Sequence, residues 1–160
     1  MPRSKPENSG TDEGASKRLA LDLLARREHS RLELKRKLKV RGFATAEIAA
    51  TLDELEATGA LAAARFTESF VRTRVAKGQG PIRIRAELDE RGVGAADAAE
   101  ALRVEGIDWN EAARAVRRKR FGPACPRDFK ERARQTRFLQ YRGFESSQIR
   151  AALELPEDSD

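Results

Sequence analysis

The sequence predicts an all-α protein built as an elongated, curved array of three tandem three-helix repeats. The first observation behind this prediction is an Arg-Gly pair that recurs after 50 and then 51 residues, at Arg41-Gly42, Arg91-Gly92 and Arg142-Gly143. Such a period marks stacked copies of one supersecondary unit. The second observation is composition, because Ala, Leu, Arg and Glu are abundant and only 6% of residues are aromatic. Local propensity therefore favours helix almost throughout.

Apolar residues recur at matched positions around the three glycines. Leucine stands four residues before each glycine, and apolar residues follow one, six and ten residues after it. These four columns are Leu38, Leu88 and Leu139; Phe43, Val93 and Phe144; Ile48, Ala98 and Ile149; and Leu52, Leu102 and Leu153. Repeats of about 45 to 50 residues are marginal alone, so neighbours are expected to share buried surface.

Five segments follow from this period. Residues 1–15 hold prolines, glycines and no apolar cluster, which predicts a disordered tail. Residues 16–59, 60–106 and 107–155 are the three predicted repeats. Residues 156–160 form an acidic tail that is expected to fray.

In the first repeat, a stripe of leucine and alanine predicts a helix that ends near His29. Ser30 and Glu33 have the spacing of a capping box, which begins the second helix. Gly42 is expected to stop that helix in the left-handed conformation. Thr45 is the predicted N-cap of the third helix, which Gly59 closes.

In the second repeat, the chain breaks at residues 77–80 before Pro81, a residue well suited to the first turn of a helix. Ile84 and Leu88 repeat the buried edge that Leu34 and Leu38 form in the first repeat. Gly92 and Gly106 are predicted to end the second and third helices.

In the third repeat, Asp108 and Asp128 are each followed three residues later by glutamate, which predicts two helix N-termini. Residues 121–126 are expected to form a turn. Gln135 stands where the other repeats have Leu34 and Ile84, so this copy is expected to pack less well or to face another way.

Charge is sorted along the chain, whose formal net charge is +6. The third helices of the first two repeats are acidic, and the first and second helices are basic. Residues 114–142 contain eleven Lys or Arg against two acidic residues, a net charge of +9. A basic bias of this kind favours a polyanionic partner.

Several classes of function have no support in the sequence. There is no metal-ligand spacing, no phosphate-binding glycine loop and no nucleophile–base pair, so neither an enzyme nor a metal or cofactor site is predicted. The single cysteine, Cys125, excludes an internal disulfide and suits the reducing cytoplasm. No apolar run reaches membrane length. Without a long apolar seam on any helix, a cytoplasmic monomer is expected.

Three stretches of the chain carry a resemblance to a known family. They are LLARREHSRLELKRKL at residues 23–38, ARFTESFVRTRVAKGQGPIRIRAELDERGV at residues 64–93 and RFLQYRGFESSQIRAAL at residues 137–153. The central stretch is the most specific. On these motifs the chain resembles the RecX family of bacterial recombination regulators over residues 17–155. Ala63 and Ala64 depart from the family pattern, in which acidic residues are common at this point.

The resemblance implies a modulator, usually an inhibitor, of the RecA recombinase. Family members look like stacks of three-helix repeats lying in the helical groove of the RecA–DNA filament. There they hinder filament extension, ATP hydrolysis, strand exchange and coprotease activity toward the SOS repressor. The family has no catalytic residues, so none are carried over.

Three basic clusters are the candidate sites for contact with the filament or with phosphate. Arginine offers planar, bidentate donors to either group, and the glycines at 78 and 80 would let a partner approach closely. For each cluster the alternative is an ordinary solvated helix face. The central cluster is Arg72, Arg74, Lys77, Arg83 and Arg85; the C-terminal cluster is Arg117, Arg118, Lys119, Arg120, Arg127, Lys130, Arg132 and Arg134; the N-terminal cluster is Arg26, Arg31 and Lys35.

Other conspicuous residues favour structural roles. The arginine before each turn glycine suits the negative end of a helix dipole. His29 has no companion ligand, and Cys125 has no nearby base. Trp109 and Tyr141 are expected to be core or half-buried anchors, although either could stack on a base.

Two functions of different classes stay open. The first is a regulator that binds the RecA filament. The second is a sequence-tolerant binder of single- or double-stranded DNA, because a three-helix unit with a tight turn resembles a helix-turn-helix. No helix carries the Asn, Gln and Arg pattern suited to base recognition.

Overall fold

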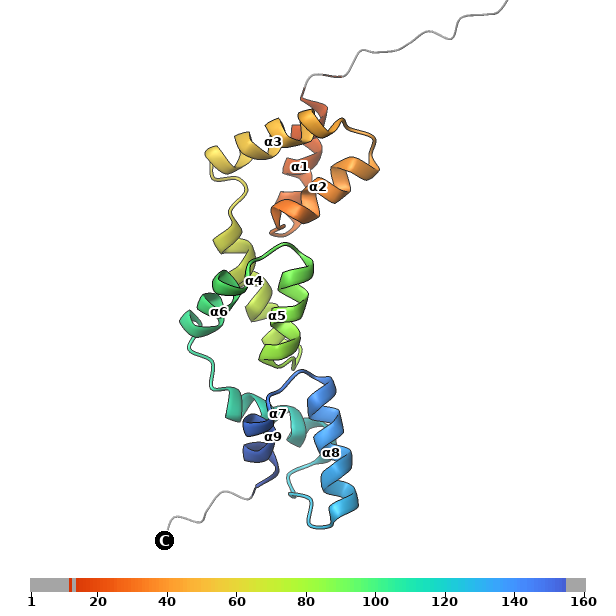
Figure 1. Ribbon diagram of the computed structural model, residues 1–160, viewed down its shortest axis with the longest axis vertical. Helices are drawn as coiled ribbons and strands as arrows, with labels where there is room; N and C mark the ends of the chain where they lie inside the picture. The colour runs from red at the N-terminus through yellow and green to blue at the C-terminus, as the bar shows by residue number, and fades with distance from the viewer. Residues whose placement is uncertain (1–11, 13, 155–160) are drawn as a thin grey trace, which may run out of the picture. The chain divides into compact units, whose positions relative to one another are not determined.

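The computed structural model describes residue 12 and residues 14–154. Within these residues the chain forms nine α-helices and no strand. Figure 1 labels the helices in chain order. The helices are α1 Ala15–Arg26, α2 Arg31–Val40, α3 Thr45–Ala57, α4 Ala63–Ala76, α5 Pro81–Glu90, α6 Ala95–Val104, α7 Trp109–Phe121, α8 Phe129–Tyr141 and α9 Ser146–Leu153. The prediction of an all-α protein with three three-helix repeats is confirmed. The predicted tails lie outside the described residues, apart from residues 12, 14 and 15.

The chain divides after Ala63 into two compact units. The first unit contains α1 to α3, and the second contains α4 from residue 64 onward together with α5 to α9. In each repeat the second helix packs against the third, and α9 also packs against α7.

The first unit encloses one apolar core. Its buried residues are Ala20, Leu34, Leu38, Ile48, Leu52, Leu55 and Leu61. A buried hydrogen bond of 2.7 Å between the hydroxyls of Ser16 and Thr51 joins α1 to α3. Ser30 forms the predicted capping box with Glu33. Thr45 is not an N-cap, because Ala44 takes the extended capping position and Thr45 begins the helix.

The second unit encloses two clusters, and Trp109 packs against both. Asp108 and Asp128 cap α7 and α8 as predicted, each accepting a hydrogen bond from the backbone N–H three residues later. Gln135 is buried, so the third repeat faces the same way as the others. Its Nε2 donates to Oε1 of Glu131 at 3.0 Å. Tyr141 is 75% exposed, and the prediction of a core or half-buried anchor is wrong for this residue.

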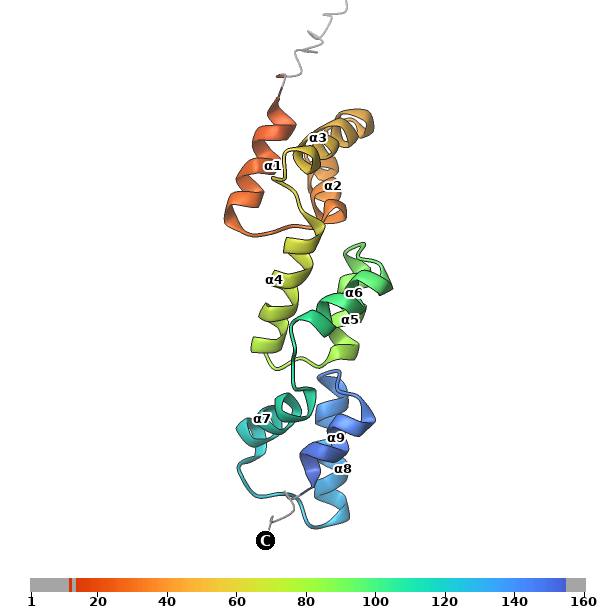
Figure 2. The same ribbon diagram turned by 90° about the vertical axis from the view of Figure 1, so that its left-hand side faces the viewer.

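The second and third repeats interlock through two turns, the α4–α5 loop and the α8–α9 turn (Figure 2). The backbone N–H of Gly80 donates to the carbonyl of Arg142 at 2.7 Å, and that of Ile82 donates to Gly143 at 2.9 Å. A Cβ on Gly80 would lie 2.5 Å from the Gly143 carbonyl. Close backbone approach at Gly80 therefore serves the third repeat, whereas the sequence suggested an external partner.

Replacing Gly80 by alanine is expected to destabilise the second unit by about 1–3 kcal/mol, because the new methyl overpacks the contact with Gly143. Gly94→Ala is the matched control: both glycines precede a helix at negative φ, but a Cβ on Gly94 meets no atom within 4 Å. Denaturant unfolding measures both free energies. Equal stabilities for the two variants would contradict the interlock.

His29 lies between α1 and α2 with only 1% of its surface exposed. Nζ of Lys37 lies 2.9 Å from Nε2 of His29, and Nδ1 of His29 lies 3.0 Å from the carbonyl of Arg27. An ammonium only donates, so Nε2 accepts and Nδ1 carries the proton of a neutral ring. Burial lowers the pKa of His29 below its ordinary value, and the charges of Arg27 and Lys37 act in the same direction.

Because folding favours the neutral ring, the stabilisation at His29 is complete above the ordinary histidine pKa of about 6.5. It is expected to be lost as the pH falls from there through the lowered folded pKa. Unfolding of the first unit, followed by hydrogen exchange in α1 and α2 at pH 7.5 and 5.5, measures the loss. A His29→Gln variant is expected to show a smaller dependence, and an identical dependence would rule His29 out as its source.

Candidate partner-binding surfaces

The central cluster is largely engaged within the chain. Arg72 on α4 pairs with Glu68, and its Nε lies 3.3 Å from Oε1 of Glu105. Arg74 lies 4.6 Å over the ring of Phe70, with its Nε 3.1 Å from Oε2 of Glu87 but without hydrogen-bond alignment.

Two further arginines of this cluster lie on α5. Arg83 pairs with Glu87 at 3.4 Å, and its guanidinium lies 5.5 Å from the centroid of the Tyr141 ring. Arg85 pairs with Glu145 of the third repeat at 3.0 Å. Exposed pairs such as Arg85–Glu145 contribute about 0–1 kcal/mol, so a partner could replace them at little cost. Lys77 is exposed and has no ion pair within the described part of the chain.

Arg117 is a correction to the C-terminal cluster. Only 2% of its surface is exposed. Its guanidinium donates to the carbonyls of Ala124 at 3.0 Å and of Gly122 and Pro123 at 3.4 Å. A buried arginine that holds the α7–α8 loop is not available to a partner.

The other arginines of this cluster on α7 and α8 are partly engaged. Arg118 pairs with Glu111 at 2.6 Å and Arg134 with Glu131 at 3.2 Å. Arg132 donates to the carbonyl of Leu153 at 3.5 Å. Arg120 stacks on Phe121 and on Phe138.

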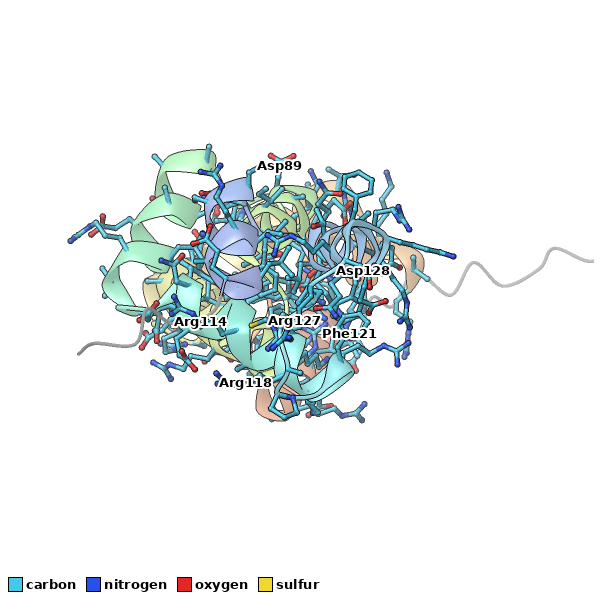
Figure 3. The ribbon with its side chains drawn as sticks, turned by 90° about the horizontal axis from the view of Figure 1, so that it is seen from below. Asp89, Arg114, Arg118, Phe121, Arg127 and Asp128 are labelled. Atoms are coloured by element: carbon cyan, nitrogen blue, oxygen red, sulfur yellow. The ribbon has the colours of Figure 1, made fainter. Side chains whose placement is uncertain are left out.

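Four cations of the C-terminal cluster remain exposed and without an ion pair among the residues that the structure describes: Lys119, Arg120, Arg127 and Lys130. Arg127 lies in the α7–α8 loop, and Lys130 lies in the first turn of α8. In Figure 3 the labelled Arg114, Arg118 and Arg127 lie in the same part of the view, at α7.

The N-terminal cluster contains one structural residue. Arg31 reaches Asp53 at 2.9 Å and Glu56 at 3.2 Å, which ties α2 to α3. Arg26 and Lys35 are exposed. Of the arginines before the turn glycines, Arg91 donates to the carbonyl of Glu87 near the end of α5, as the helix-dipole interpretation suggested.

The sequence did not single out Phe129, whose surface is 88% exposed. It lines a groove of about 500 Å³ between α8 and α9, together with Arg132, Arg137 and Arg150. The position of Phe129 in the helical period could have indicated its exposure. It stands six residues before buried Gln135, which places it away from the inward face of α8.

None of the helices α1 to α9 has the length and apolar character to span a bilayer. Among residues 12 and 14–154, no three His, Cys, Asp or Glu side chains gather as a metal site. Cys125 is partly exposed, with its Sγ 3.7 Å from the carbonyl of Glu154.

Comparison with known proteins identifies all three repeats. Models of the first, second and third three-helix domains of RecX match residues 17–55, 64–102 and 108–153. The regulatory protein RecX of Pseudomonas savastanoi pv. phaseolicola is 52% identical over 81% of this chain and 84% of its own. That of Halorhodospira halophila is 45% identical over 95% and 94% of the two chains.

Solved structures show the same fold. The crystal structure of RecX from Lactobacillus salivarius superposes with a TM-score of 0.73 at 20% identity, covering 88% of this chain and 94% of that one. A second crystal structure, of regulatory protein RecX, gives a TM-score of 0.72 at 22% identity over 88% and 70%. With three matched domains and close relatives across most of its length, the chain belongs to the RecX family.

Proposed function

We propose that this protein is a negative regulator of the RecA recombinase. It binds along the groove of the RecA–DNA filament and suppresses filament extension, ATP hydrolysis, strand exchange and coprotease activity. The regulatory role named for its relatives supports the proposal. We also infer that it acts as a cytoplasmic monomer without a cofactor.

The observation that carries the proposal is the set of cations left unpaired on the third repeat. In the C-terminal cluster these are Lys119, Arg120, Arg127 and Lys130, which lie on or beside α7 and α8 with no carboxylate partner among the described residues. Unpaired surface cations meeting a polyanion release its counterions, so affinity falls as salt rises. Arg117 is left out of the proposed surface because it is buried.

RecA ATP hydrolysis on single-stranded DNA is expected to fall as this protein is added, and the inhibition is expected to weaken with salt because electrostatic contacts are screened. A coupled ATPase assay at several salt concentrations measures both effects. Full ATPase activity at low-micromolar protein and moderate salt would contradict the proposal.

Reversing Arg127 and Lys130 together to glutamate is expected to raise the inhibitory concentration at least about tenfold, or ~1.4 kcal/mol. Both side chains are exposed, so helical content measured by circular dichroism should not change. Arg74→Glu and Arg85→Glu are poor tests, since those arginines already pair within the chain.

Arg18→Glu with Arg103→Glu is the matched control for this reversal. It makes the same charge change at two exposed arginines that pair with Asp12 and Glu100, outside the proposed surface. If the control lost as much inhibition as the test variant, net charge alone would explain the effect and the assignment to the third repeat would fail.

Direct, sequence-tolerant DNA binding is the second candidate, and Phe129 favours it. An exposed aromatic ring beside Arg132, Arg137 and Arg150 resembles the stacking platforms of single-strand binders. Gel mobility shifts on naked DNA and on RecA-coated DNA separate the two candidates. Tighter binding to naked DNA would place direct binding first.

A further inference from the structure

A groove of about 510 Å³ lies between the second and third repeats, inside the second unit. Its walls come from the end of α4, from α7 and from the end of α8. The floor is apolar and includes Val75, Val116, Phe138 and Phe144. No aspartate or glutamate is among the residues that line it.

Four cationic side chains line this groove, and they differ in the contacts that they make within the chain. Arg142 donates to the carbonyl of Lys77 at 3.0 Å and stacks on Phe138, so it supports the interlock of the repeats. Arg120 also stacks on Phe138. Lys77 and Lys119 are exposed and, within the described part of the chain, have no carboxylate at ion-pair distance.

Gln79 adds an unmet acceptor to the groove. Its residue surface is only 7% exposed, and it lines the groove beside Lys77. Its buried Oε1 has no hydrogen-bond partner among the described residues. A buried acceptor without a partner gains a hydrogen bond from any donor that reaches it, and an N–H group of a bound ligand is one such donor.

We propose that this groove binds an acidic peptide segment that carries one apolar side chain. The apolar side chain packs on Val116 and Phe138, and flanking carboxylates pair with Lys77 and Lys119. A peptide N–H donates to Oε1 of Gln79. This proposal adds to the proposed function the chemistry of the partner segment. It rests on the proposed function only for the identity of the protein that carries the segment.

A peptide fits this groove better than a nucleic acid does. Nucleic acid brings phosphates for the lysines and base N–H groups for Gln79, but its flat bases do not fill a floor formed by valine and phenylalanine side chains as a branched aliphatic side chain does. A peptide brings all three groups within a few residues. Backbone N–H groups are present in every segment except at proline, so the amide contact needs no special sequence.

The probe is a fluorescein-labelled synthetic peptide with a central leucine flanked on each side by two acidic residues, and fluorescence anisotropy with the full chain at low salt measures its affinity. Binding is expected, with at least a tenfold loss when serine replaces the leucine or when lysines replace the acidic residues. An absence of saturable binding would overturn the proposal.

Three variants test the three contacts. Lys77→Glu with Lys119→Glu is expected to weaken binding at least tenfold, and so is Ala115→Trp, which fills the groove from an exposed position. Gln79→Leu is expected to weaken binding about threefold without lowering the melting temperature, because it removes an unpaired buried oxygen. Arg103→Glu is the control that keeps full affinity.

Other occupants give distinct results. An oligothymidine strand that displaces the peptide, and that is itself lost with Ala115→Trp, would assign the groove to nucleic acid and overturn the proposal. Much tighter peptide binding after Glu157→Gln, Asp158→Asn and Asp160→Asn would assign it to the acidic end of this chain.

RecA is absent from these measurements, so their failure is separable from that of the proposed function. RecA inhibition without peptide binding would support the regulatory role and reject the groove as a peptide-binding site. Peptide binding without RecA inhibition would support the groove as a peptide-binding site and contradict the proposed regulatory role.

Discussion

The second unit depends on one close backbone contact, in which Gly80 lies against Gly143. The N–H groups of Gly80 and Ile82 donate to successive carbonyls of the α8–α9 turn. Two hydrogen bonds at this distance leave no room for a Cβ on either glycine. Because the contact joins backbone to backbone, it fixes the third repeat against the second more firmly than exposed ion pairs such as Arg85–Glu145 could. The same contact holds the α4–α5 loop against the α8–α9 turn, and residues beside both line the groove next to Gln79.

Most arginines of the second unit are engaged within the chain, whereas its lysines have no ion pair among the described residues. Arginines at 74, 83, 85, 117 and 142 donate to carboxylates or carbonyls or stack on rings. The three lysines at 77, 119 and 130 have no ion pair among the described residues. A planar guanidinium can donate along several directions and lie flat on an aromatic ring, whereas an ammonium is compact and strongly hydrated. Most of the arginines that make the sequence basic are therefore engaged in contacts within the chain. The positive charge that is free to contact a partner is smaller than the net charge of the sequence suggests, and it is more localised.

Local signals in the sequence predicted much of the fold. The capping spacings at Ser30, Asp108 and Asp128 depend on neighbouring residues alone, and all three helices begin there. The leucine columns predicted the core because each buried stripe repeats with the helical period. The inward turn of a single arginine was not predicted in this way. Arg117 turns inward because the α7–α8 loop presents three carbonyls to it. Its register, four residues after buried Ala113, distinguishes it from the other three residues of the basic run, but a charged side chain is not expected on a buried face.

The N-cap position of the second helix in each repeat can serve one of two purposes: a side chain there can cap the helix, or the absence of a side chain can let another repeat pack closely. Ser30 and Asp128 use their side chains to bind the backbone N–H groups of their own helices. Gly80 has no side chain with which to cap α5, but Pro81 follows it and removes one of the N–H groups that would need a partner. The carbonyl of the third repeat then takes the N–H of Ile82. A serine or aspartate at position 80 would cap α5 better in isolation, yet its Cβ would push the Gly143 turn away. Because position 80 is glycine, α5 has no side-chain N-cap, and the backbone of the third repeat can pack against the start of this helix.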